Sequence, residues 1–477
     1  MSQEDFCLSA VDRALSLGTE YVEVRFQMES TESIIYKNGE VEGIVSEIEG
    51  GVGIRVLIDG ALGFSSTNIM VDASVDKAVE KAVKMAKVAA GRISEPIEFV
   101  PSETYNIFYT AVERDKWENI DLKEKISLLG EVEDMLVDKK RFQIRFPYRL
   151  LELQRRLEEK FFVNSEGTSI TSKVPRVGAT YMITGVNNGD SVQRIGQIGG
   201  SGGWEILING DFVGRVQQDA KVLEKILLEA TKTPEEKVDV VVGSEVAGIM
   251  VHEALGHPSE ADRIMGREAA QAGESYLTPE SIGMKIGSEE VYVSDDPTIP
   301  GSYGFYFFDD EGVKAERRIL VEAGRVQNFL HNRETAAKLN VESNGAARAM
   351  SYSVEPIIRM ANTYFEPGEY SFEELIEDVK LGVYVKNFME WNIDDRRVNQ
   401  RYTGLEAYLI EKGEVTKPVR NPVIETTTQE LLGKLDARGR DLEFHAATCG
   451  KGDPEQGAPV WNGGPHLRFR EVRLGTR

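Results

Sequence analysis

Two histidines and a glutamate lie within six residues near the middle of the chain, as His252-Glu253 and His257. Imidazole nitrogens bind borderline-soft cations such as Zn²⁺, and a neighbouring carboxylate can take a proton from a metal-bound water. The set therefore predicts a metal-hydrolase site with Glu253 as the general base. The alternative is two unrelated histidines, one packed in the core and one at a helix end.

The spacing of the two histidines requires a distorted helix if both are to face one ion. They are five residues apart, whereas the common H-E-x-x-H pattern places its two histidines on one face with a spacing of four. Five steps of ~100° separate the side chains by roughly 140° on an ideal helix. Gly256 and Pro258 flank His257, so we predict that the helix widens by one residue or unwinds there.

A strand and a buried helix are expected to position this set. The largely apolar run Val238–Val242 predicts the strand. Ser244 is a plausible N-cap, and the apolar residues that follow recur at helical spacing. The expected helix begins at Ser244 and carries His252 and Glu253.

Several further motifs follow the histidines in order. The run H-E-x-x-x-H continues into P-x-E-A-D, and these motifs resemble the TldD/PmbA (modulator of gyrase) metallopeptidase family, in its catalytic TldD-type branch. The resemblance covers the C-terminal half closely and the N-terminal half more loosely. The other matching segments are Gly301–Gly304, Phe308–Gly312, Arg359–Tyr364, Glu406–Ile410 and Cys449–Gly452.

The resemblance implies a zinc peptidase in which Cys449 joins His252 and His257 as the third metal ligand. Two imidazoles and a thiolate leave a fourth position for water, as catalytic zinc requires. Glu253 would take the proton of that water and pass it to the leaving amine. Apart from the resemblance, a lone cysteine is more often a small buried apolar residue. The family also implies peptide or unfolded-protein substrates, bound as an added strand in a cavity between subunits.

Other polar residues near the motif have two interpretations each. His445, four residues before Cys449, is an alternative ligand or a hydrogen-bond partner of one. Glu260 and Asp262 either orient a ligating imidazole or lie on a solvated helix face. The segment 271–285 follows the site and is either a lid or an ordinary surface loop. The segment 390–401 departs from the family pattern because it is bulky and charged, which bears on substrate choice and on the partner surface.

Composition excludes some classes of function. The chain has 477 residues and a formal net charge of −23, which disfavours binding to nucleic acid. No apolar run approaches the ~20 residues that span a bilayer. The acidic start and the two cysteines, Cys7 and Cys449, predict a protein without a secretory signal or a disulfide framework. We expect a cytoplasmic protein with no nucleic-acid or membrane partner.

The pattern of apolar residues predicts an α+β protein with two domains. Residues 1–232 are expected to form an antiparallel sheet with helices, including a half-buried strand from Tyr21 to Met28 and hairpin turns at Asn38-Gly39 and Asp59-Gly60. The glycine-rich run 196–203 predicts a flexible loop or a close backbone contact. Residues 233–477 are expected to form a β-rich, barrel- or sandwich-like domain of short strands, one of them at 305–307, that carries the metal helix.

The predicted function is a zinc-dependent peptidase that cleaves short or unfolded peptides. Three alternatives remain open: a non-catalytic peptide-binding subunit, a scaffold whose histidines are merely packed, and a metallo-hydrolase of non-peptide amides or esters. The resemblance implies a dimer, either of this chain or with a relative that lacks the motif.

Overall fold

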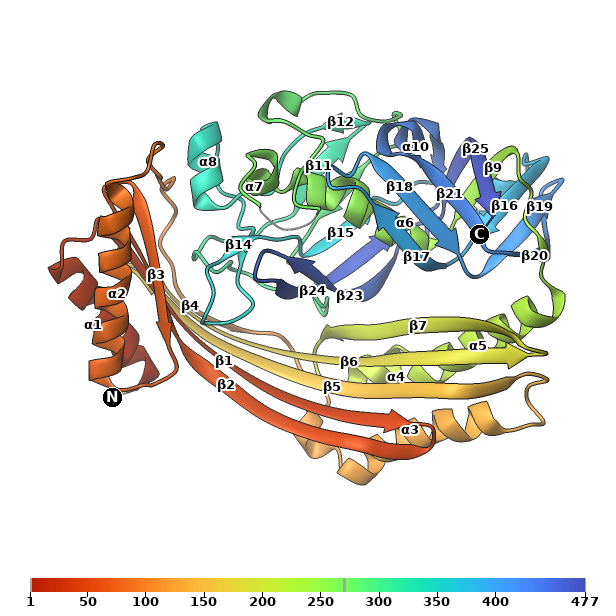
Figure 1. Cartoon of the computed structure of the whole chain (residues 1–477), viewed down its shortest axis with the longest axis horizontal. Helices are drawn as coiled ribbons and strands as arrows, with labels where there is room; N and C mark the ends of the chain where they lie inside the picture. The colour runs from red at the N-terminus through yellow and green to blue at the C-terminus, as the bar shows by residue number, and fades with distance from the viewer. Residues whose placement is uncertain (1, 269–271, 477) are drawn as a thin grey trace.

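The computed structural model describes residues 2–268 and 272–476. A long, curled antiparallel sheet forms the N-terminal half, and a β-rich C-terminal region lies on its concave side (Figure 1). This confirms the predicted α+β class. Among the described residues, no helix is long and apolar enough to cross a membrane.

The N-terminal sheet has seven strands in the described part of the chain, in the order β3-β2-β1-β5-β6-β4, with β7 paired to β6. Asn38 and Asp59 adopt positive φ angles, each followed by a glycine, which confirms the two hairpin turns. The strand that begins at Tyr21 is longer than the predicted Tyr21–Met28, because β1 and β2 each continue through the curl. The strands are β1 (Tyr21–Lys37), β2 (Glu40–Ile58), β3 (Ala61–Thr67), β4 (Asn106–Thr110), β5 (Arg145–Asn164), β6 (Ser169–Asn187) and β7 (Asp190–Ser201).

Helices cover the face of this sheet that points away from the C-terminal half (Figure 1). Apolar side chains of α1 and α2, including Cys7, share a core with β1, β2 and β5, and α3, α4 and α5 share another with β5, β6 and β7. Ser2 and Asp5 form a capping box at the start of α1. The helices are α1 (Gln3–Ser16), α2 (Asp72–Ala90), α3 (Leu122–Val137), α4 (Glu205–Asn209) and α5 (Phe212–Glu229).

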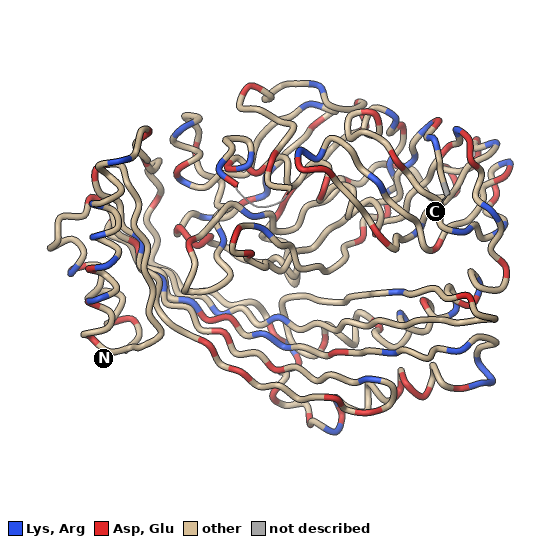
Figure 2. The backbone as a smooth tube through the Cα atoms, in the orientation of Figure 1, with Lys and Arg blue, Asp and Glu red and all other residues tan. Residues whose placement is uncertain are grey.

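The predicted strand at Tyr21–Met28 is confirmed as the start of β1, but its predicted half-burial is wrong, because its polar face is also buried. Arg25 Nη2 donates to the carbonyl oxygens of Ser351 and Val354 at 3.0 and 2.9 Å. Arg55, on the neighbouring strand, is ion-paired to Glu23 at 2.8 Å and to Glu311 at 2.6 Å. Acidic and basic residues are mixed along the curled strands (Figure 2). Alternation therefore marked two different buried layers, one apolar and one charged.

The C-terminal half contains a six-stranded sheet, β12-β11-β10-β15-β24-β23, and a ten-stranded sheet that runs from β17 to β8, both counted over the described residues. One apolar core joins residues of both sheets to helix α6. The predicted strand at 305–307 is wrong: this stretch has no strand structure. The elements that position the site are β9 (Lys237–Val242), α6 (Ser244–Val251), β17 (Phe388–Ile393), β18 (Asn399–Gly404), β23 (Glu443–Lys451) and β24 (Gln456–Gly464).

The remaining elements complete these two sheets, a β13–β14 pair and short helices. The strands are β8 (Thr231–Lys232), β10 (Val293–Asp295), β11 (Arg318–Glu322), β12 (Arg325–Val326), β13 (Ala347–Arg348), β14 (Ile357–Ile358), β15 (Asn362–Phe365), β16 (Leu381–Val385), β19 (Ala407–Glu411), β20 (Glu414–Arg420), β21 (Pro422–Thr427), β22 (Leu435–Arg438) and β25 (Leu467–Thr476). The helices are α7 (Ala261–Ile264), α8 (Arg333–Leu339), α9 (Phe372–Ile376) and α10 (Thr428–Lys434).

The glycine-rich run 196–203 lies largely in β7, so a flexible loop was the wrong prediction. Close backbone contact is what the glycines permit. A Cβ added at Gly200 would lie 2.7 Å from the carbonyl oxygen of Gly301 in the C-terminal half. The two halves therefore approach each other here without an intervening side chain.

Candidate metal centre

Strand β9 leads directly into α6 through Gly243. Gly243 is the N-cap, so the prediction that Ser244 caps the helix is wrong. A Cβ at Gly243 would lie 2.7 Å from the carbonyl oxygen of Lys386, which leaves no room for a capping side chain. Ser244 is instead the first helical residue, and its hydroxyl lies 2.9 Å from His445 Nε2 and donates to Glu443 at 3.0 Å.

The helix widens at the two histidines. Residues His252–Gly256 form a π-helical turn, and the backbone N–H of His257 donates to the carbonyl oxygen of His252, five residues earlier. This confirms the predicted distortion, since a π turn brings positions i and i+5 together. A Cβ at Gly256 would lie 2.1 Å from Met360 Sδ, so the close approach of Met360 requires glycine there.

The turn brings His252 and His257 together, and β23 adds Cys449. The ligand atoms of these three buried residues all lie within 4.8 Å of one another. Cys449 Sγ is 3.4 Å from His257 Nε2. Tetrahedral zinc with bond lengths of ~2.0–2.3 Å holds its donor atoms about 3.3–3.8 Å apart. The pair Cys449 and His257 lies at this separation, and with His252 inside the 4.8 Å bound the three donors suit a zinc ion with one position left open.

An unpartnered polar atom gives a second reason for the fit. His252 Nδ1 is buried and has no hydrogen-bond partner among the described residues. Burial opposes the charged form of this imidazole, but the facing Cys449 sulfur and Glu253 outweigh it and raise the pKa of His252. The ring therefore lies in strongly negative surroundings, as expected of a position beside a cation.

Cys449 is held as a thiolate on the hairpin of β23 and β24. Burial opposes ionisation, yet His257, His252 and Arg359 together hold the pKa of the thiol well below its usual value. Arg359 donates to the carbonyl oxygens of Cys449 and Gln456, which clamps both strands of the hairpin. Cys7, in contrast, is an ordinary core residue whose thiol has its pKa raised to about 12 by burial.

Glu260 orients His257. Its Oε2 lies 2.9 Å from His257 Nδ1 and also accepts from Arg263 at 2.5 Å. Burial opposes its charge, but Lys451, His257 and Arg263 keep the pKa of Glu260 well below its usual range. The imidazole therefore turns its Nε2 toward Cys449. Asp262 does not share this role, because it is ion-paired with Lys451 at 2.7 Å.

Glu253 has partners that sequence reasoning missed. Its Oε1 accepts from Trp391 Nε1 at 3.2 Å, and its Oε2 forms an ion pair with Arg397. Both residues belong to the segment 390–401, which forms β17, β18 and the turn between them. The bulk and charge of that segment were the available signal, but nothing in the sequence directed it to Glu253.

The segment after the histidines packs against the site. Ser275 Oγ donates to the carbonyl oxygen of Pro258, and Tyr276 OH to that of Ala254, both at 2.8 Å. Residue 271, the first of the predicted lid, lies outside the described residues. His445 contacts Ser244 at the start of α6 and is not part of the three-residue cluster.

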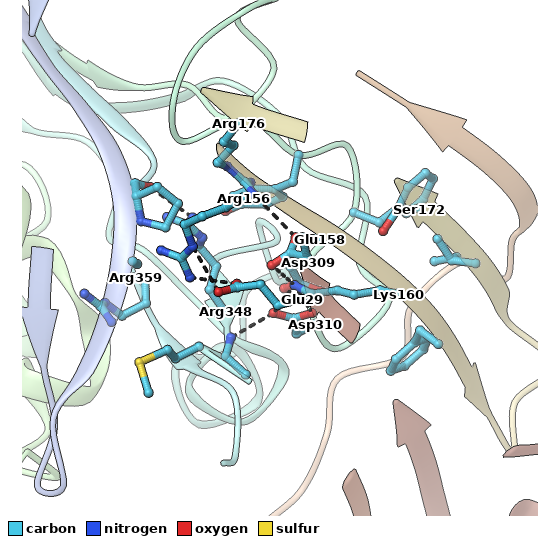
Figure 3. A pocket seen from close by; sticks show the side chains of 18 of the residues that line it. Glu29, Arg156, Glu158, Lys160, Ser172, Arg176, Asp309, Asp310, Arg348 and Arg359 are labelled. Carbon is cyan, nitrogen blue, oxygen red and sulfur yellow. Dashed lines mark hydrogen bonds and ion pairs between the residues drawn. The ribbon is translucent and has the colours of Figure 1, made fainter. Parts of the chain in front are cut away.

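A charged pocket lies behind the Cys449 hairpin, between the curled sheet and β24 (Figure 3). Arg156 pairs with Glu29 at 2.7 Å, and Lys160 lies between Glu158 and Asp310 at 3.2 and 3.0 Å. Burial opposes the ionisation of Glu158, but Lys160 and Arg176 lower its pKa to about 2. The pocket has a volume of about 50 Å³ and admits only a few water molecules. These ion pairs join strands of the curled sheet to each other and, through Asp310, to the C-terminal half.

Comparisons with known proteins match most of this chain. The models for the PmbA/TldA metallopeptidase domain 1, central domain and C-terminal domain match residues 22–86, 115–246 and 235–476. The chain is 31% identical over 461 residues to a metalloprotease from Methanocaldococcus jannaschii, covering 97% of this chain and 98% of that protein. It is 33% identical over 238 residues to a zinc metalloprotease TldD homolog from Saccharolobus solfataricus, covering 50% and 51% of the two chains.

A solved structure shares the fold. The crystal structure of a candidate modulator of DNA gyrase from Thermotoga maritima superposes with a TM-score of 0.79 at 20% identity, covering 99% of this chain and 100% of that one. The curled sheet, the β-rich C-terminal half and the matched domains together define a metallopeptidase class of protein. Within that class, the chain belongs to the PmbA/TldD metallopeptidase family, which confirms the resemblance found in the sequence.

Proposed function

We propose that this chain is a zinc-dependent peptidase that cleaves short or unfolded peptides. The observation that carries the proposal is the π turn, which brings His252 and His257 to one side of the helix, facing the Cys449 thiolate. The S. solfataricus relative is named as a zinc metalloprotease, and the 3.4 Å between Cys449 Sγ and His257 Nε2 suits that metal. His252, His257 and Cys449 would hold it.

Each residue around the cluster would have a separate role in the reaction. A bound zinc ion would lower the pKa of a water and polarise the scissile carbonyl. Glu253 is the group placed to take a proton from that water and deliver it to the leaving amine. Arg397 and Trp391 hold the Glu253 carboxylate in place, and Glu260 fixes the tautomer of His257.

The edge of β23 supports binding of an extended peptide. This strand pairs with β24 and forms the end of its sheet among the described strands. A peptide added at that edge would lie alongside Cys449 and bind through main-chain hydrogen bonds, with little demand on sequence. We propose that the working form is a dimer, either of two copies of this chain or of this chain with a relative that lacks the motif. We also propose a cytoplasmic location.

Two alternatives have less support. A non-catalytic peptide-binding or scaffold subunit would have no need of an ionised cysteine aimed at two imidazoles. A hydrolase of non-peptide amides or esters would use the same groups, so only substrates distinguish it.

Zinc analysis and peptide digestion test the proposal together. We expect about one zinc per chain, and cleavage of a peptide library read by mass spectrometry. Glu253→Gln should retain zinc while cleavage falls by ~10²-fold or more, because the base is lost. Glu124→Gln, at an exposed position of α3 in the N-terminal half, is the matched control. Absence of bound or acquired zinc, or full activity of Glu253→Gln, would refute the mechanism.

A further inference from the structure

A cavity of about 390 Å³ lies between the N-terminal sheet and the C-terminal half. Its walls come mainly from β7, α6, β17 and β23, with single residues of β6, α5 and β24. Among the described strands, β17 and β23 each stand at the end of a sheet, and β7 branches from β6. The size is within the usual range of ligand sites, about 300–1,000 Å³, and far above that of the charged pocket behind the hairpin.

Three separate elements connect this cavity to the candidate metal centre. Glu245 and Ile249 line it from α6, and Glu253 follows one helical turn further along the same face. Ala447 lines it from β23, two residues before Cys449 and therefore on the same side of the strand. Trp391 lines it from β17 and donates to Glu253 Oε1 at 3.2 Å. The cavity therefore adjoins the reactive groups.

The chemistry of the wall is that of an apolar binding pocket. Ile249, Leu405 and Phe388 contribute aliphatic and aromatic surface, and the Trp391 ring is 44% exposed. The charges at the wall balance: Arg194 pairs with both Glu245 and Asp219 at 2.7 Å, and Arg215 is a second cation in the lining, so two cations face two carboxylates. Such a wall favours an uncharged ligand group over an acidic or basic one.

We propose that this cavity binds a large apolar side chain, aromatic or branched aliphatic, of the peptide residue next to the scissile bond. The inference rests on the proposed peptidase function and adds a preference that main-chain pairing at the β23 edge would not give. Burial of such a side chain favours binding by about 10-fold or more over glycine or aspartate at that position.

Binding to the Glu253→Gln protein tests the pocket without turnover. Four peptides identical except for Phe, Leu, Gly or Asp at one position are titrated by calorimetry into the zinc-loaded and the zinc-free protein. We expect the Phe and Leu peptides to bind about 10-fold or more tightly than the other two. Met389→Trp in the same background should abolish that preference, because Met389 lines the cavity. Met85→Trp, on the exposed face of α2, should leave it unchanged.

A second variant protects the test against misfolding. Phe388→Ala enlarges the pocket and should weaken the Leu peptide more than the Gly peptide. Equal binding of all four peptides, or an unaltered preference in both pocket variants, would overturn the proposal. Cleavage of all four peptides at one rate would leave the peptidase standing without the pocket. A clear binding preference in a parent protein that cleaves none of the peptides would support the pocket and refute the peptidase function.

Discussion

The guanidinium of Arg397 and the carboxylate of Glu253 form a buried ion pair across 144 residues of sequence. Arg397 is 4% exposed and adopts a positive φ of 60° in the turn between β17 and β18. Glu253 is held from its other oxygen by Trp391. The carboxylate proposed as the base is thus held in place by a hairpin that is distant in sequence from the metal-binding helix.

Replacing Arg397 should damage both stability and catalysis. Arg397→Gln leaves Glu253 buried without its cation, which costs about 3–5 kcal/mol, and we expect kcat/KM to fall by ~10²-fold. Urea unfolding and peptide kinetics measure the two effects. Arg396→Gln, the exposed neighbour with a side chain 63% accessible, should change neither. Parent kinetics in Arg397→Gln would mean that Glu253 positions itself without this partner.

Cys449→Ser should release the metal. The thiol is ionised because His257, His252 and Arg359 outweigh its burial, whereas a serine hydroxyl is not ionised at neutral pH. We expect zinc affinity to drop by more than ~10²-fold, beyond the loss typical of residues that only support a ligand. Chelator competition measures it. Cys7→Ser, on the far side of the molecule in α1, serves as the control and should retain parent affinity.

The distorted helix depends on Gly256. An alanine Cβ would meet Met360 Sδ at 2.1 Å, so Gly256→Ala should destabilise the fold by about 1–3 kcal/mol and displace His257. Denaturation and zinc titration report the two changes. Gly433→Ala in α10 meets nothing within 4 Å and should instead stabilise by about 0.5–1 kcal/mol. Adding Met360→Ala should rescue Gly256→Ala; failure of rescue would locate the strain elsewhere.

The helix distortion was predictable because its cause is local. Gly256 and Pro258 flank His257, and the spacing of five has few solutions. Cys449 lies 192 residues from His257, so its place depends on how β23 joins the six-stranded sheet, and only the family resemblance identified it. No family motif includes Arg397, so its contact with Glu253 could not be predicted from the sequence. The alternation in Tyr21–Met28 predicted that its polar side chains face water. Instead, carbonyl and carboxylate oxygens of the C-terminal half bind the polar side chains on this face of the sheet.

Stability should fall on mild acidification through His331. Burial lowers the pKa of His331 to about 4 from its usual 6.5. The unfolded chain therefore binds a proton that the folded chain excludes between these values, so the contribution is intact above pH 6.5 and is lost as pH falls toward 4. The full loss is about 3 kcal/mol. Thermal unfolding of the parent and of His331→Gln across this window measures it; parallel curves would contradict the assignment.

The last prediction concerns assembly. His252, His257 and Cys449 are each 5% exposed or less, so a substrate reaches them only as a narrow, extended chain. A peptidase with such a site spares compact proteins if a second subunit closes the approach, and the curled sheet offers a wall for that chamber. We expect light scattering to show a dimer, or a dimer once a motif-lacking relative is added. The same protein should be digested when denatured and resist when folded, with a nonspecific peptidase as the control for unfolding. A monomer that cuts folded substrates as fast as unfolded ones would exclude the enclosed site and leave the zinc chemistry to be judged on the Glu253 and Cys449 variants.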